Sequence, residues 1–187
     1  MFPVTQLNER INQLDNNPAE YDDVYVGNLF LNKSGEVEFK PCSDSPIRDF
    51  PIKDNKQKGA IEIFQMPERD RNGKVYSNRY IAGIDPTDSD CADTMSLCSI
   101  FILDLYTDKI VAEYTGRQDF ADDNFELMRL LLLFYNAKAC YENNLKGLYA
   151  YFSRTNCVHL LCDTPEYLKD KQLIKLSGYG NKAHPYS

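Results

Sequence analysis

Between residues 80 and 163, apolar segments of two different periodicities alternate along this chain, and their order restricts the folds that it can adopt. Three strand-like segments come first, then a segment with helical spacing, a short strand-like segment, a second helical segment and a last short apolar segment. Strands that alternate with helices are typical of parallel crossover connections within one sheet. The order therefore predicts an α/β fold, with a mixed sheet flanked by helices.

The bounds of these elements follow from period-two alternation in strands and from the 3.6-residue period of helices. We expect strands over residues 80–85, 94–105, 110–114, 138–142 and 157–162, and helices over 122–135, 144–154 and 164–178. Asp122 and Asp123 favour a helix start, because acidic side chains stabilise the positive end of the helix dipole. The first three strands should form an antiparallel meander, with the fourth strand beside the first.

The first forty residues predict a separate pair of elements. Apolar residues at helical spacing indicate a short amphipathic helix over residues 4–14. Strand-like segments at 24–31 and 36–40 flank a polar turn that contains Gly35, which is typical of a β-hairpin. This helix and hairpin form the expected N-terminal extension.

A polar stretch at residues 41–59 lacks apolar periodicity and is interpreted as a linker. We therefore divide the chain into an N-terminal extension and linker over 1–58 and a main domain over 59–187. A strand is also expected over residues 60–64, and a turn rich in Asn and Gly separates it from the strand at 80–85. These two strands are expected to pair locally.

Two acidic residues end apolar strands of the main domain: Asp85 follows the first strand of the meander, and Glu142 ends the fourth strand. Ligands of α/β sheets collect at the carboxyl ends of parallel strands, and neighbouring strands lie about 5 Å apart. Two carboxylates in this arrangement can bind Mg²⁺, and paired ions catalyse phosphodiester hydrolysis. The alternative is that both acids are turn residues, which residue type alone favours.

Four segments, taken in order, resemble the nuclease domain of the tailed-phage terminase large subunit. They are GAIEIFQMP at residues 59–67, YIAGIDP at 80–86, Gly-Arg at 116–117 and YENNxxG at 141–147. The similarity covers roughly residues 59 to 180. It implies an RNase H-like fold for the mixed sheet and reverses the balance in favour of a metal site.

The resemblance implies roles for particular residues. Asp85 and Glu142 would be the catalytic acids that hold Mg²⁺ or Mn²⁺, and Asp93 would be an accessory metal ligand. Candidate DNA contacts are Arg117, Asn143 and Asn144. The alternative for Arg117 is a surface turn residue, and the asparagines can instead cap the following helix.

The implied function is that of an endonuclease in viral genome packaging, which cuts double-stranded DNA by a two-metal mechanism. Further implied partners are the portal and other packaging proteins, in the cytoplasm of a bacterial host that carries a phage or prophage. The chain has no 18-residue apolar run and no signal-peptide pattern, so no membrane partner is expected. Its net charge of -7 argues against a general nucleic-acid binder, although bound metal ions reverse the local sign of the charge.

The sequence departs from the family in two respects. No segment has the spacing of a Gly-rich phosphate loop, so no ATPase motor is expected in this chain. A third metal acid is expected on a C-terminal helix, yet no acidic residue follows Asp170, and Asp163 fits a turn better. Three interpretations remain open: an endonuclease lacking its last helix, an inactive remnant that binds metal or protein, and an RNase H-like nuclease or resolvase outside packaging.

Six cysteines lie mostly inside apolar runs, which favours buried reduced thiols over a disulfide framework. Cys157, His159 and Cys162 are close in sequence, but alternate residues of a strand point to opposite faces. A zinc site formed by these three residues is therefore not expected.

Overall fold

In a computed structural model of the chain, the described residues are 4–16, 24–48, 52, 57–87, 96–142 and 146–163. The elements in chain order are α1 (Val4–Asn16), β1 (Tyr25–Leu31), β2 (Val37–Pro41), β3 (Ile61–Ile63), β4 (Tyr80–Asp85), β5 (Cys98–Asp104), β6 (Lys109–Gly116), α2 (Ala121–Tyr135), β7 (Lys138–Tyr141), α3 (Gly147–Arg154) and the 3-10 helix η2 (Val158–Leu160). The helix expected over residues 164–178 lies outside these ranges.

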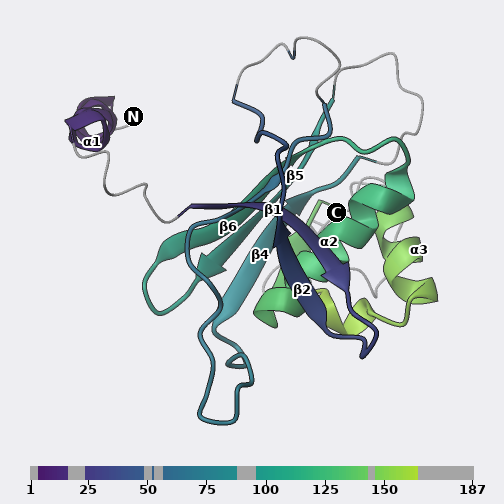
Figure 1. Cartoon of the computed structure of the whole chain (residues 1–187). Helices are drawn as coiled ribbons and strands as arrows, with labels where there is room; N and C mark the ends of the chain where they lie inside the picture. The colour runs from purple at the N-terminus through teal and green to yellow at the C-terminus, as the bar shows by residue number, and fades with distance from the viewer. Residues whose placement is uncertain are drawn as a thin grey trace, which may run out of the picture.

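All the described strands belong to one mixed sheet with the order β2-β1-β3-β6-β5-β4-β7 (Figure 1). Strand β7 runs parallel to β4, and every other neighbouring pair is antiparallel. The predicted meander of β4, β5 and β6 is confirmed, and so is the position of the fourth strand of that series beside the first. The chain is thus an α/β protein with a mixed sheet and helices packed against it.

The expected local pairing of β3 with β4 is wrong. Strand β3 lies between β1 and β6, with Glu62 aligned with Val26 on one side and with Glu113 on the other. The connection from β3 to β4 forms its own turn, closed by the Arg69–Val75 bridge, so it does not impose a hairpin on its two flanking strands. Strands β1 and β2 therefore continue the same sheet, while the division at residue 58 stays a prediction.

Helices α2 and α3 lie on the same side of the sheet (Figure 1). Alternate residues of each strand point to opposite faces of the sheet. The buried residues of the meander lie on the covered face and form one core with the buried residues of α2. These include Ala82, Ile84, Ile100, Ile102, Phe125, Met128 and Leu132. The opposite side, called the open face below, exposes Gly83, Asp85 and Phe101.

The prediction of a strand over residues 157–162 is wrong for most of that segment. Residues Val158–Leu160 form a 3-10 turn, and a single parallel bridge joins Leu161 to Ala139 of β7. A left-handed backbone at Asn156 (φ 58°) turns the chain at the end of α3, which leaves little length for a strand. Among the described residues, the outer edge of β7 is therefore paired through this single bridge.

The predicted N-terminal helix is present as α1, and its apolar residues Val4, Leu7 and Ile11 are exposed. None of the helices in the described ranges has the length and apolar character needed to cross a membrane.

Candidate metal site at the ends of β4 and β7

Asp85 is the last residue of β4, and Glu142 directly follows β7. The parallel alignment of Ile84 with Tyr141 brings the two acids to the same edge of the sheet. Ile84 and Tyr141 are both buried, whereas Asp85 and Glu142 are exposed, so the two acidic side chains lie on the open face. This is the arrangement that the strand-end positions predicted.

The two carboxyl groups lie close enough to share a side-chain hydrogen bond. Partial burial raises the pKa of Asp85, and the negative charge and hydrogen bond of Glu142 raise it further. Neighbouring acids repel each other when both are ionised, and a cation between them relieves that repulsion. An all-oxygen pair of this kind fits a hard divalent cation such as Mg²⁺ or Mn²⁺.

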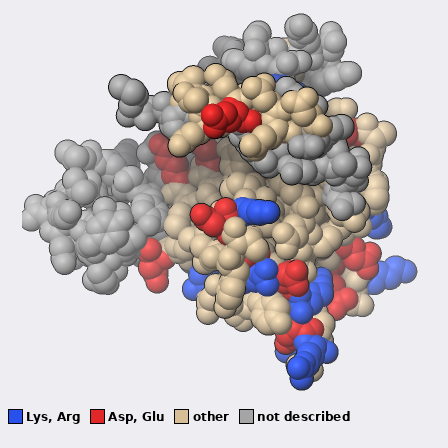
Figure 2. All heavy atoms as spheres, turned by 90° about the vertical axis from the view of Figure 1, so that its left-hand side faces the viewer, with Lys and Arg blue, Asp and Glu red and all other residues tan. Residues whose placement is uncertain are grey.

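A hollow of about 370 Å³ lies on the open face beside the acid pair, and its lining includes Gly83, Cys140 and Glu142. A Cβ atom placed on Gly83 would meet no other atom within 4 Å, so the missing side chain leaves real space. Seen from the left-hand side of Figure 1, acidic and basic side chains of the described residues are interspersed on the face in view, without a continuous basic area there (Figure 2). A phosphate group beside Asp85 and Glu142 would meet two negative charges, so it would need bound cations to neutralise them.

Arg117 directly follows β6 and is only 6% exposed, which differs from a surface turn residue. Its backbone N–H donates a hydrogen bond to the carbonyl oxygen of Gln57 at 2.6 Å. Burial raises the pKa of the Cys98 thiol, the negative charge of Asp85 raises it further, and the positive charge of Arg117 lowers it. Both charged residues therefore lie near Cys98 at this edge of the sheet. A DNA contact by Arg117 stays a prediction.

Three predicted site residues, Asp93, Asn143 and Asn144, lie outside the described residues. Asp163 is among the described residues and comes two positions after the bridge residue Leu161. Burial is the largest cause that raises the pKa of the Cys162 thiol, and the negative charge of Asp163 adds to it. Within the described ranges, no group of three or more His, Cys, Asp or Glu side chains could hold a metal ion. Here the site consists of an acid pair.

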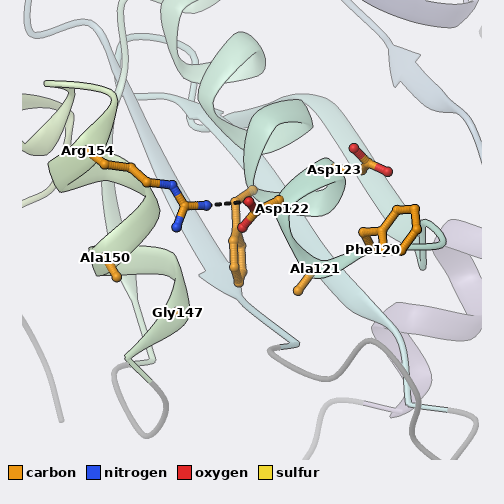
Figure 3. Close-up of a pocket in the computed structure, with 8 residues that line it drawn as sticks. Phe120, Ala121, Asp122, Asp123, Gly147, Ala150 and Arg154 are labelled. Carbon is orange, nitrogen blue, oxygen red and sulfur yellow. Dashed lines mark hydrogen bonds and ion pairs between the residues drawn. The ribbon is translucent and has the colours of Figure 1, made fainter.

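A second cavity, of about 610 Å³, lies between the start of α2 and α3 and was not predicted from the sequence. Asp122 of α2 forms an ion pair with Arg154 of α3 across it, while Asp123 and Phe120 lie on the other side of the helix start (Figure 3). Gly147 and Ala150 supply small residues on the α3 side. The close approach of the two helices, set by tertiary packing, creates this cavity.

No model of a known protein family matches the chain, and a search of curated proteins finds no significant match. The chemistry of Asp85 and Glu142 therefore provides the main basis for a functional proposal.

Proposed function

We propose that the chain is a metal-dependent DNA endonuclease with an RNase H-like fold, which forms the nuclease part of a viral genome-packaging terminase. The observation that carries the proposal is the position of Asp85 and Glu142 at adjacent ends of two parallel strands, on the same face and within hydrogen-bonding reach. The family motifs around both acids supply the link to packaging.

The strand order supports the proposed fold. From β6 to β7 the order is β6-β5-β4-β7, with an antiparallel meander, a crossover through α2 and a parallel fourth strand. That order is the one expected for an RNase H-like sheet. The parallel bridge from Leu161 to Ala139 lies on the outer side of β7, where such a sheet has its fifth strand.

The proposed chemistry assigns separate tasks to the protein and to the metal. Asp85 and Glu142 would hold Mg²⁺ or Mn²⁺ at the edge of the sheet, and β4 and β7 fix the position of both carboxylates. When bound, the cations would neutralise the phosphodiester charge and increase the acidity of the attacking water. The hollow at Gly83 leaves space beside Glu142 for a part of the substrate.

A second candidate function is a catalytically inactive module that binds metal or another protein. It is favoured by the number of acidic ligands. Within the described ranges no third potential ligand joins Asp85 and Glu142, whereas the family uses three acids. Fewer anionic ligands lower the affinity for metal and leave a second ion poorly held. We therefore expect weak binding of Mn²⁺ and slow cleavage of DNA, or no cleavage at all.

The test is cleavage of supercoiled plasmid with Mn²⁺ by the chain and by its Asp85→Asn and Glu142→Gln variants. Each of these substitutions should lower the cleavage rate by about 100-fold or more, equivalent to at least ~2.7 kcal/mol of transition-state stabilisation. Asp163→Asn is the matched control, because it removes an acid close to this edge but outside the pair, and it should change the rate by less than about twofold.

Cleavage that is equally fast with the chain and with Asp85→Asn would contradict the proposed active site. Binding of Mn²⁺ that depends on Asp85, without cleavage of any DNA, would support the inactive module instead. Preferential cutting of branched DNA over linear DNA would indicate a nuclease that acts outside packaging.

A further inference from the structure

Cys140 and Cys162 are 22 positions apart in the sequence but are neighbours in the sheet. Ala139 forms a parallel bridge with Leu161, and the backbone N–H of Cys162 donates a hydrogen bond to the carbonyl oxygen of Ala139 at 2.8 Å. The two cysteines are therefore the next aligned pair after that bridge. Both are free and half-buried, and their thiols lie within hydrogen-bonding reach of each other.

The alignment places the two side chains on the same face of the sheet. In β7, Ala139 and Tyr141 are buried against the covered face, so Cys140 between them points to the open face. Cys140 also lines the hollow beside Gly83, which gives this thiol a path to solvent. By contrast, the thiols of Cys98 and Cys157 are buried.

The spacing of neighbouring strands admits two uses of this pair. Neighbouring strands lie about 4.8 Å apart, which is within the Cα separations of about 4.4–6.8 Å that disulfides span. A metal ion joined to two sulfur atoms by bonds of about 2.3 Å also fits an aligned pair of thiolates. Because both thiols are free in this structure, we consider their use as metal ligands under reducing conditions.

The number of ligands narrows the choice of metal. Structural zinc sites use four protein ligands, and the described residues do not gather even three potential ligands here. Thiolates select soft ions, and monovalent copper is stable with only two sulfur ligands. Glu142 lies on the same face, but its carboxylate is a hard ligand that suits Mg²⁺ or Mn²⁺.

We propose that Cys140 and Cys162 form a two-thiolate binding site for a soft monovalent ion of the Cu(I) class. Binding converts two thiols and one Cu(I) ion into a bis-thiolate complex and releases two protons, with no change in the oxidation state of copper or sulfur. Cys140 lines the same hollow as Glu142, but the thiolate ligands differ from the two acids, so copper retention is measured without nuclease activity.

The test measures retention of Cu(I) by the whole chain, without oxygen and with a phosphine reductant, against a chromogenic Cu(I) chelator. The Cys140→Ser and Cys162→Ser variants should each retain copper much more weakly, by more than the 10- to 100-fold that loss of an outer-shell partner costs. Cys42→Ser is the matched control, since Cys42 is also half-buried but lies next to β2, and it should retain copper like the parent chain. Circular dichroism checks that each variant is folded.

Peptide mapping after alkylation identifies the cysteines that copper protects. Protection of Cys140 and Cys162 together, lost in either single variant, would support the proposed site. Full copper retention in both folded serine variants would overturn it. A Cys140–Cys162 disulfide that forms in air, with no copper retained under reduction, would also overturn it in favour of an oxidation-sensitive pair.

Discussion

The backbone N–H of Glu142 donates a hydrogen bond to the carbonyl oxygen of Ile84 at 3.1 Å. This bond continues the parallel pairing of β7 with β4 one residue past Tyr141 and fixes Glu142 beside Asp85. A shift of one residue in this register would turn the Glu142 side chain to the other face. The candidate metal site therefore depends on the alignment of two short strands.

The acid pair should destabilise the metal-free protein at neutral pH. The folded-state pKa of Asp85 is raised, so its contribution favours folding below its unfolded pKa of about 3.9 and is lost as the pH rises through the folded value. We expect Asp85→Asn to raise Tm at pH 7 only slightly, by at most about 1–2 °C, because solvent screens the repulsion between exposed carboxylates. Differential scanning calorimetry in chelator-treated buffer measures this change, and a lower Tm would contradict the repulsion.

Divalent cations should reverse the destabilisation that the acid pair causes in the metal-free protein. Mn²⁺ at ten times its dissociation constant would stabilise the parent chain by about 1.4 kcal/mol, or roughly 3–6 °C in Tm. The Asp85→Asn variant should lose most of this gain, because it lacks one of the two anionic ligands. Thermal unfolding in a series of Mn²⁺ concentrations tests the prediction, with Asp163→Asn as the control that keeps the full response.

Two Arg–Asp ion pairs differ in burial and should differ in energy. Asp104 is fully buried and accepts three hydrogen bonds from the Arg79 guanidinium at 2.8–3.1 Å, whereas Asp122 and Arg154 are exposed. Asp104→Ala leaves the partly exposed Arg79 without its ion partner and should lower the free energy of unfolding by about 1.5–3 kcal/mol, the range for hydrogen bonds to charged groups. Asp122→Ala should cost at most about 1 kcal/mol. Urea unfolding of both variants compares them, and similar losses would contradict the assignment.

Asp104 should also make stability depend on acid pH. Burial raises the pKa of this carboxyl, but hydrogen bonds from Arg79 and from the Tyr106 backbone N–H outweigh it, and the net pKa is lowered. A lowered pKa stabilises the fold above the unfolded value of about 3.9, and this contribution is lost as the pH falls through the folded value. We expect the stability difference between the parent chain and Asp104→Asn to shrink below about pH 4. A difference that stays constant down to pH 2 would exclude this linkage.

Two glycines of the sheet should respond in opposite ways to an added methyl group. A Cβ on Gly116 would overlap the Lys58 carbonyl oxygen and lie 2.6 Å from the Tyr114 hydroxyl oxygen, so Gly116→Ala should cost about 1–3 kcal/mol. A Cβ on Gly83 meets nothing within 4 Å, so Gly83→Ala should be neutral or stabilise by up to about 1 kcal/mol. Chemical unfolding of the two variants provides the comparison, and a loss above 1 kcal/mol in Gly83→Ala would show that the hollow is not open.

Much of the meander was predictable from local patterns. Alternating apolar residues define β4 (Tyr80–Asp85) within the expected bounds, and helical spacing defines α2 (Ala121–Tyr135) to within a residue. The position of Asp85 and Glu142 at strand ends was also visible, because each directly terminates an apolar run. The failure at residues 157–162 shows the limit of periodicity, since a short apolar run fits a strand or a 3-10 turn equally well.

The sequence by itself determined most of the strands and helices, although not the 3-10 turn at Val158–Leu160, and it determined which strands end in an acidic residue, because these properties depend on residues a few positions apart. Only the tertiary structure decided the partners of β3, the ion pair of Arg79 with Asp104 and the approach of Cys140 to Cys162. Each of these depends on the alignment of distant segments, and packing of the whole sheet against α2 and α3 selects that alignment. The same packing brings Asp85 and Glu142 from the ends of two separate strands to one edge of the open face.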